Sequence, residues 1–394
     1  MSASTSPTCS DSPSSAPANR TGGNSEILVA DIPIEIVSEE EMAFIEAALS
    51  AATSSFGLAT RSWGPLSPCR RFATSFPPSP ARRIVRTPPR SPRDIEDSAG
   101  PALKRSLLRD FRSGRGLTVT DITATEWCEK RMEFVVLRGK PGRTKAMIAG
   151  SNRHAQLEEE VVEKIEIQTN SVEDSWAVKF LNFIAGVNQL LFEGLTRELP
   201  VIGFVEGIWL KGVIDEVQMP TREVLTNPLL VDTKTRVKLT LPSEAQKRNS
   251  RLQLMCYKYL WDTLVLNSFP KEQFFKYFCL NPDCILSEDV NKYIVSLGLP
   301  AKTLEDVVTY FKDTCCVLSP AQEQLLLRYE LQSDHSLLEE YQFEYEEDWL
   351  KARIRECIMF WSGEREANYV EDSENWKCRY CSFTEMCPKQ SSQT

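Results

Sequence analysis

Four cysteines lie at the two ends of one long stretch of the chain, and they constrain its fold more than any other feature. Cys128 stands alone, and Cys378, Cys381 and Cys387 follow much later with the spacing C-x2-C-x5-C. Cysteine thiolates favour soft metals such as Zn²⁺ and iron–sulfur clusters. A site that used all four cysteines would join the beginning of a domain to its end, so the segment between them must fold back on itself.

The composition is that of a globular chain that buries a core. Of the 394 residues, 42% are hydrophobic and 26% are charged, which are ordinary values for globular domains. No apolar run reaches the roughly 18–20 residues of a membrane span. The N-terminus lacks the charged and apolar regions of a secretory signal. We therefore expect an intracellular chain with mostly reduced thiols and no membrane contact.

The N-terminal part divides into segments of different composition. Residues 1–26 are rich in Ser, Thr and Pro and are expected to be disordered, whereas residues 27–53 have the pattern of a short strand and a capped helix. Residues 54–116 are predicted to be a basic Pro/Ser/Arg-rich linker. Within it, residues 61–115 contain 13 Lys and Arg against 4 Asp and Glu. The overall net charge of −9 therefore does not exclude nucleic acid as a ligand.

The folded domain is predicted to span residues 117–390. Apolar residues recur at helical spacing in residues 145–167, 173–196 and 245–265, and a further helix that carries Cys128 is predicted to begin at Thr118 or Thr120. Residues 201–205, 209–217 and 229–237 read as apolar strands. Strands of this kind between helices predict a mixed sheet covered by helices, in an α/β core with helical additions.

Two acids and one lysine follow these strands in a pattern typical of metal-dependent hydrolysis. Asp232 and Lys234 are two residues apart, so they project from the same side of a strand with Thr233 between them. Asp215 lies in the preceding strand, within a Gly-x-x-Asp sequence. Two acids on neighbouring strands can share Mg²⁺ or Mn²⁺, while the lysine orients water or offsets charge on a phosphate. Alone, Asp-x-Lys is also a common surface ion pair.

Two helices contribute further candidates. His154 is one of only two histidines, and neutral imidazole is a good metal ligand. Glu158 lies one helical turn later and could orient His154, bind metal through water, or be solvated. Gln253 and Tyr257 share a helix face, where Gln253 could hydrogen-bond near the metal and Tyr257 could stack on or contact DNA. Each residue alone fits an ordinary structural role, so the indication of a nuclease rests on their order along the chain.

That order, H then G-x-x-D then D-x-K then Q-x-x-x-Y, resembles the PD-(D/E)xK nucleases of the RecB type, with Asp where many members have Glu. The one-plus-three cysteines that frame it resemble those of the [4Fe–4S] nucleases; zinc or free thiols are the alternatives. With the sequences R-H-x-x-L-E, V-D-T-K-T-R and W-K-C-R-Y-C, the chain is similar to the exonuclease V family over residues 117–390. The predicted fold is thus an α/β, restriction-endonuclease-like core with a mixed sheet flanked by helices and a C-terminal iron–sulfur clasp.

The resemblance implies a Mg²⁺-dependent, single-strand-specific DNA exonuclease that acts in DNA repair. It implies an active site of His154, Asp215, Asp232 and Lys234, and a [4Fe–4S] cluster on the four cysteines. We further expect the Thr233 carbonyl to be a metal ligand, and Gln253 and Tyr257 to support catalysis. The expected location is the nucleus and also the cytosol, rather than mitochondria.

Single-strand selectivity predicts a narrow, basic, aromatic-lined channel. The candidate DNA contacts are Lys247, Arg248, Arg251, Lys377, Arg379 and Tyr380. Expected partners are single-stranded DNA, a single-strand-binding protein and repair factors, and the chain is expected to be a monomer. Two alternatives remain at this point: a non-catalytic single-strand-binding module on a nuclease fold, and an RNA nuclease.

Overall fold

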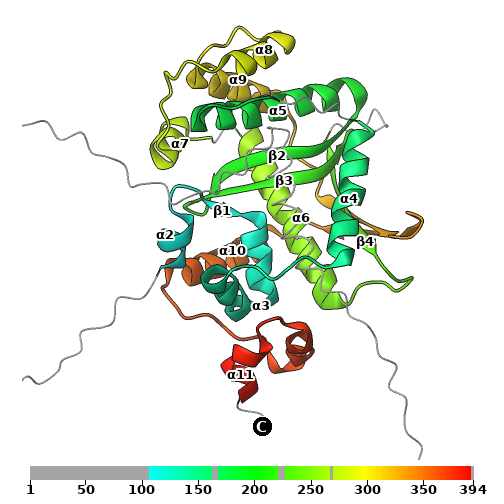
Figure 1. Cartoon of the computed structure of the whole chain (residues 1–394). Helices are drawn as coiled ribbons and strands as arrows, with labels where there is room; N and C mark the ends of the chain where they lie inside the picture. Colours follow the sequence, from blue (N-terminus) through cyan, green and yellow to red (C-terminus); the bar gives the residue numbers. More distant parts are fainter. Residues whose placement is uncertain (1–105, 162–166, 221–226, 267–268, 392–394) are drawn as a thin grey trace, which may run out of the picture. The chain divides into compact units, whose positions relative to one another are not determined.

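A computed structural model describes residues 106–161, 167–220, 227–266 and 269–391 (Figure 1). The predicted segments 1–26 and 27–53, and the linker up to residue 105, lie outside the described residues. The described part begins with α2 (Leu107–Arg112), in which Leu107 is buried. The Arg112 guanidinium lies 5.2 Å from the Trp361 ring centroid. Residues 106–116, which composition assigned to the linker, are therefore packed against the C-terminal part of the chain.

Within the described residues, six strands form one mixed sheet. They are β1 (Leu117–Thr118), β2 (Leu195–Val205), β3 (Ile208–Gln218), β4 (Leu229–Arg236), β5 (Gln324–Leu331) and β6 (Leu337–Glu344). The order is β1-β3-β4-β5-β6, and β2 also pairs with β3. β1 is parallel to β3 and β4 is parallel to β5, while the other pairs are antiparallel. The predicted mixed sheet is confirmed, and all three predicted strands belong to it.

Helices pack along this sheet. They are α3 (Val119–Arg138), α4 (Lys145–Glu159), α5 (Val172–Glu193), α6 (Glu244–Val265), α7 (Lys271–Phe278), α8 (Glu288–Ser296), α9 (Leu304–Cys316) and α10 (Glu347–Ser362). The chain then forms η1 (Asp372–Tyr380), η2 (Thr384–Met386) and α11 (Pro388–Ser391). Figure 1 shows α5 along β2, α6 crossing β2 and β3, and α4 beside β4. Thr118 caps α3 through a reciprocal capping box with Asp121, which confirms one of the two predicted helix starts.

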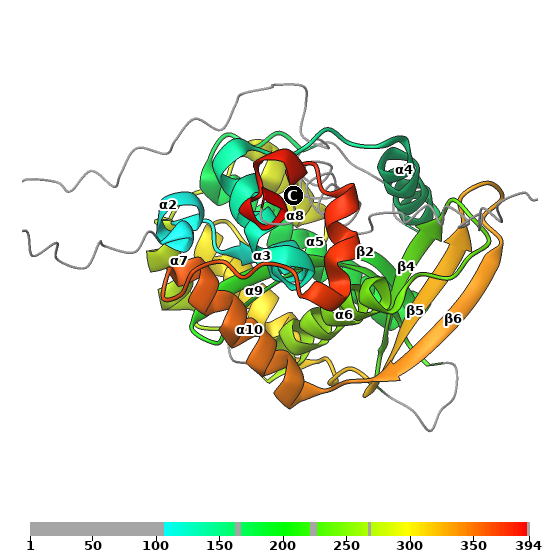
Figure 2. The same cartoon turned by 90° about the horizontal axis from the view of Figure 1, so that it is seen from below.

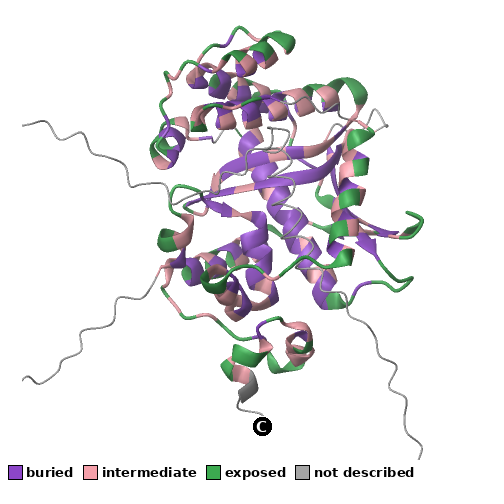
Figure 3. Ribbon diagram, viewed as in Figure 1, coloured by how far each residue is buried: buried purple, intermediate pink, exposed green. Residues whose placement is uncertain are grey.

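An aromatic core joins α5 to the helices above the sheet. Phe180 lies 4.6 Å from Phe311 and 5.3 Å from Phe274, between ring centroids. Trp209 of β3 lies 5.6 Å from Phe274. Pairs of this kind contribute about 0.5–1.5 kcal/mol beyond their burial. Figure 3 shows that β2, β3, β4 and the inner faces of these helices are mostly buried, so this part of the sheet forms a rigid base for the residues that it carries.

A membrane span requires a helix of sufficient length and apolar character. In the part of the chain that the structure describes, no helix is long and apolar enough to cross a membrane.

Candidate active site

β3 and β4 separate at the two predicted catalytic acids. Their pairing runs from Gln218 with Leu229 to Glu216 with Val231 and stops there. The next residues are Asp215 and Asp232, which are 5% and 0% exposed. Beyond this point β4 pairs only with β5. The two carboxylates therefore lie side by side where the strands part, and the prediction that they come from neighbouring strands is confirmed.

This pair of acids is electrostatically suited to a cation. Burial, and then the neighbouring carboxylate of Asp215, raise the pKa of Asp232 well above its usual range. Two buried carboxylates so close together resist ionising at the same time. Lys234 Nζ lies 3.1 Å from Asp232 Oδ2 and offsets one charge only. A divalent cation would allow both acids to ionise, so the residues present fit such an ion.

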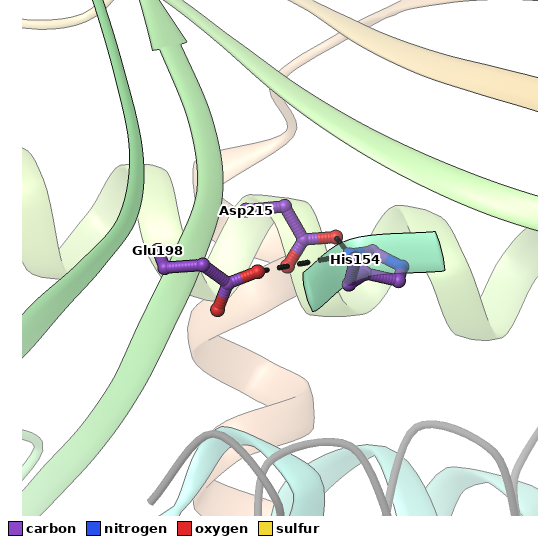
Figure 4. Close-up of side chains that lie close together, drawn as sticks. All are labelled: His154, Glu198 and Asp215. Carbon is purple, nitrogen blue, oxygen red and sulfur yellow. Dashed lines mark ion pairs between the residues drawn. The ribbon is translucent and has the colours of Figure 1, made fainter. Parts of the chain in front are cut away.

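α4 brings a histidine to the same place. His154 Nδ1 lies 3.5 Å from Asp215 Oδ2 and 3.7 Å from Glu198 Oε1 (Figure 4). One potential ligand atom from each of the three residues lies within 4.8 Å of the other two. Burial, and then the Lys234 ammonium, lower the pKa of His154 to about 4. The imidazole is therefore neutral at neutral pH, which is the form that binds metals.

Glu198 is a site residue that the sequence analysis missed. It lies in β2 between two paired residues, Arg197 opposite Glu216 and Leu199 opposite Ile214, so it stands across from Asp215. Its φ of 52° is costly for a residue with a side chain. The signal in the sequence is an acid next to an apolar strand, but we predicted that strand to begin only at residue 201. Glu198 is thus an acid that the fold brings together with His154 and Asp215.

The lysine of the site is held in place by α6. Lys234 Nζ donates to Gln253 Oε1 at 2.9 Å, and Gln253 Nε2 donates to the Tyr257 hydroxyl at 3.2 Å. Gln253 is 1% exposed and Tyr257 is completely buried. The predicted role of Tyr257 in stacking on DNA is therefore wrong, because its ring reaches no solvent. Both residues instead position the ammonium beside Asp232. Thr233 is buried, and its backbone hydrogen-bonds His154.

Arg197 connects the three elements that carry the site. Its Nε lies 2.8 Å from Glu216 Oε2, next to Asp215 in β3. Its Nη1 donates to the Leu157 carbonyl and to Glu160 Oε2, both at 2.6 Å, at the end of the helix that carries His154. Arg197 itself precedes Glu198. One guanidinium thus sets the positions of α4, β2 and β3 relative to one another.

The residues predicted to contact DNA lie mostly in ion pairs with acids. These pairs are Lys247 with Glu339 at 3.0 Å, Arg248 with Glu126 at 2.8 Å and Glu374 at 2.9 Å, Arg251 with Glu244 at 2.9 Å, and Lys377 with Glu374 at 2.6 Å. Lys377 is only 4% exposed. Arg379 is exposed and Tyr380 is partly exposed. The positive charges of Lys247, Arg248, Arg251 and Lys377 are therefore offset by acids of the protein itself.

The four cysteines meet at one cavity, although the sequence separates Cys128 from the others. Helix α3 is interrupted at Cys128, where the backbone is extended, with φ −172° and ψ 113°. This break exposes backbone N–H groups, and that of Arg131 donates to Cys128 Sγ at 3.4 Å. Figure 2 shows the C-terminal segment, in red, beside α3. N–H donors to sulfur are typical of cysteines that bind a metal or a cluster.

Cys378, Cys381 and Cys387 line that cavity together with Cys128, Phe134, Tyr369 and Val370. Burial, and then the thiols of Cys128, Cys381 and Cys387, raise the pKa of Cys378. The Thr384 hydroxyl donates to the Cys378 carbonyl at 2.6 Å and to the Cys381 carbonyl at 2.7 Å, which orders the turns between the cysteines. Four converging sulfurs with an apolar wall fit a tetrathiolate-bound group, either an iron–sulfur cluster or zinc.

The chain is thus a mixed α/β protein with two separate sites: a buried group of acids and a histidine that could bind a cation, and a group of four cysteines. A family profile described as "Exonuclease V - a 5' deoxyribonuclease" matches residues 106–227, 221–315 and 300–388. A protein from Danio rerio named "Exonuclease V" is 30% identical over 288 residues, which cover 72% of each chain. The chain belongs to the exonuclease V family. Membership supports a nuclease, and therefore a hydrolase.

Proposed function

We propose that this chain is a Mg²⁺-dependent, single-strand-specific DNA exonuclease that acts from 5′ ends in DNA repair. The observation that carries the proposal is the meeting of His154, Glu198, Asp215 and Asp232 with Lys234 at the point where β3 and β4 separate. The family description, a 5′ deoxyribonuclease, supports both the substrate and the direction. We assign β2–β5 and α6 to a PD-(D/E)xK nuclease core on the same grounds.

The residues that would hold the cation are His154, Glu198, Asp215 and Asp232, together with the Thr233 carbonyl. When bound, Mg²⁺ or Mn²⁺ would lower the pKa of a water molecule and offset charge on the phosphate. Lys234, fixed by Gln253 at 2.9 Å, donates a hydrogen bond to the attacking water or to a phosphate oxygen. The pKa of His154 is about 4, so its imidazole would be neutral, and able to bind the cation, over the whole neutral pH range.

Single-strand selectivity follows from the depth of the site. His154, Asp215, Asp232 and Gln253 are all at most 8% exposed. We expect that a single strand can bring one phosphate close to these buried residues, whereas the second strand of a duplex would hold the backbone too far away. Melted or single-stranded ends are therefore the substrates that we expect.

We also propose that the four cysteines hold a [4Fe–4S] cluster that fastens the C-terminal segment to α3. A cluster would supply strong Fe–S bonds and a one-electron couple; the structural role is the one that we favour. Trp127 and Trp376, which neighbour the cysteines, pack edge to face with centroids 5.8 Å apart. This contact lets the segment dock on α3 beside the cluster. We place the enzyme in the nucleus and cytosol as a monomer, with a single-strand-binding protein and repair factors as partners, on the family resemblance alone.

The test uses full-length protein purified anaerobically. Oligonucleotides labelled at the 5′ or the 3′ end, as single-stranded DNA, duplex DNA and RNA, are incubated with Mg²⁺, with EDTA as the control. Asp232→Ala is the matched inactive variant. We expect products to be released first from the 5′ label, only from single-stranded DNA and only with the metal. DNA binding without cleavage in Mg²⁺ and Mn²⁺ would contradict the proposal. Faster cleavage of RNA than of DNA would show that the substrate is RNA instead of DNA.

A further inference from the structure

Two loops near the active site are basic and contain no acid. Residues 139–145 and 237–241 carry four basic residues and no Asp or Glu. The basic residues are Lys140, Arg143, Lys145 and Lys238. This is unusual in a chain whose net charge is −9. In the part of the chain that the structure describes, Lys145 and Lys238 form no ion pair with an acid, unlike the basic residues of α6 and η1.

Both loops are tied to the end of the strand that carries Asp232 and Lys234. Gln332 Nε2 donates to the Thr235 hydroxyl in β4 at 2.9 Å and to the Ala146 carbonyl in α4 at 3.1 Å. This links the first turn of α4, and so the loop before it, to the end of β4. Arg236 Nε donates to the Thr240 carbonyl at 3.2 Å and holds the second loop. At about 3.3 Å per residue, Leu239 lies at most about 17 Å from Lys234 along the chain.

The second loop also exposes apolar side chains. Val237, Leu239 and Leu241 are 51%, 76% and 47% exposed, and Figure 3 shows the loop after β4 as exposed. Ile148, in the first turn of α4, is 46% exposed. Apolar side chains next to cations suit a ligand with anionic and apolar parts. Single-stranded DNA is such a ligand, because both its phosphates and the faces of its bases are accessible.

We propose that these two loops, which we call the entry surface, bind the single strand next to the active site. The cations of residues 139–145, with Lys238, contact phosphates, and Leu239 contacts the bases that follow the cleaved nucleotide. The strand thus approaches along the end of β4 beside the N-terminal turn of α4. This inference rests on the proposed nuclease function. It adds the path of the substrate, which the motifs of the active site do not specify.

The test measures binding without cleavage. Two changes are made in full-length Asp232→Ala protein: the double substitution Lys145→Gln with Lys238→Gln, and Leu239→Ser. The matched controls are Lys302→Gln, an exposed lysine before α9, and Leu266→Ser, which is 74% exposed at the far end of α6. Fluorescence anisotropy of a labelled oligothymidine gives Kd at several salt concentrations.

We expect the double variant to bind about tenfold more weakly and to reduce the slope of log K against log salt by about 1.4, which is about 0.7 for each lost phosphate contact. Leu239→Ser should weaken binding about fivefold with an unchanged slope, because base contacts release no ions. Both controls should match the Asp232→Ala parent. The inference is overturned if the entry-surface variants bind like the controls, or if the controls lose as much affinity.

A second measurement distinguishes failure of this inference from failure of the proposed function. The same substitutions are made in the chain that keeps Asp232, and cleavage of single-stranded DNA is measured. If the native chain does not cleave single-stranded DNA, the proposed function fails. If it cleaves, and Leu239→Ser has the same KM as Leu266→Ser, only the entry surface fails. An increase in KM of about fivefold in Leu239→Ser alone, with equal thermal unfolding midpoints for both variants, supports it.

Discussion

Replacing Arg197 with methionine should weaken both the fold and the affinity for metal. The side chain of Arg197 is 12% exposed and that of its partner Glu216 is 4% exposed. A buried hydrogen bond from a charged group contributes about 1.5–3 kcal/mol, and Arg197 makes two, to Glu216 and to the Leu157 carbonyl. The third partner, Glu160, is 54% exposed and adds little. Glu216 keeps its ion pair with Arg328 at 3.2 Å, so we expect a loss of about 3 kcal/mol.

Such a loss lowers the unfolding midpoint by roughly 5 °C, because the entropy of unfolding is about 2.1 cal/mol/K per residue and the domain is large. Because Arg197 holds α4 against β2 and β3, we also expect the Mg²⁺ concentration for half-maximal cleavage to rise about tenfold, as for residues that orient metal ligands. Cleavage at saturating Mg²⁺ should fall much less. Mn²⁺ binding followed by electron paramagnetic resonance checks the metal affinity without turnover.

Arg328→Met is the matched control. It removes the other partner of Glu216 and its contact with Glu340. Among the described residues, the side chain of Arg328 makes no hydrogen bond or ion pair with α4 or Glu198. It should therefore lower stability without changing the Mg²⁺ requirement. If Arg197→Met and Arg328→Met require the same Mg²⁺ concentration as the unchanged protein, Arg197 does not position the metal ligands and the reasoning is refuted.

Three further predictions concern single residues. Glu198→Gln should raise the Mg²⁺ requirement at least tenfold by removing one charge from the site, with Glu158→Gln unchanged; equal titrations would exclude Glu198 as a ligand. Cys381→Ser should lose iron and visible absorbance and destabilise the C-terminal segment, as measured by iron and sulfide analysis and limited proteolysis; a zinc-loaded, colourless native protein would contradict the cluster. Burial, and then Lys211, lower the pKa of Lys179 to about 7. The unfolded chain therefore binds the extra proton between about pH 7 and 10, and stability should rise with pH over that range. Urea midpoints at pH 7 and 9 should differ more for the native chain than for Lys179→Met.

Much of the architecture could be predicted from local patterns. The apolar run before Asp232 marks a buried strand, and the alternation of strands places Asp215 on its neighbour; β3 and β4 confirm both. Thr118 with Asp121 marks the start of α3. These features depend on residues close together in the sequence, so the pattern alone is sufficient to find them.

The features that the sequence analysis did not predict depend on contacts between distant parts of the chain. Glu198 could not be found from the sequence because its place in the site depends on strand pairing. Its backbone in β2 is left-handed, with a φ of 52°, and it stands opposite Asp215. Tyr257 lies one helical turn after Gln253, on a face that the sequence allowed to be at the surface. In the structure α6 packs this face onto the sheet, so that Tyr257 is 0% exposed. Lys247 and Arg248 of α6 have acid partners from β6, η1 and α3, such as Glu339 and Glu374, and these partners lie too far away in the sequence for a local pattern to show them.

By itself, the sequence determined which reactive groups are present: His154, paired acids, a lysine, and cysteines at both ends of a domain, in an order that indicates a nuclease. The tertiary structure decided which of these groups meet. β3 and β4 separate after Val231, which brings two carboxylates together in a buried space. The break in α3 at Cys128 turns its sulfur toward the other three cysteines. Such meetings depend on packing between distant segments, because burial and charge at a residue are set by the neighbours that the fold supplies.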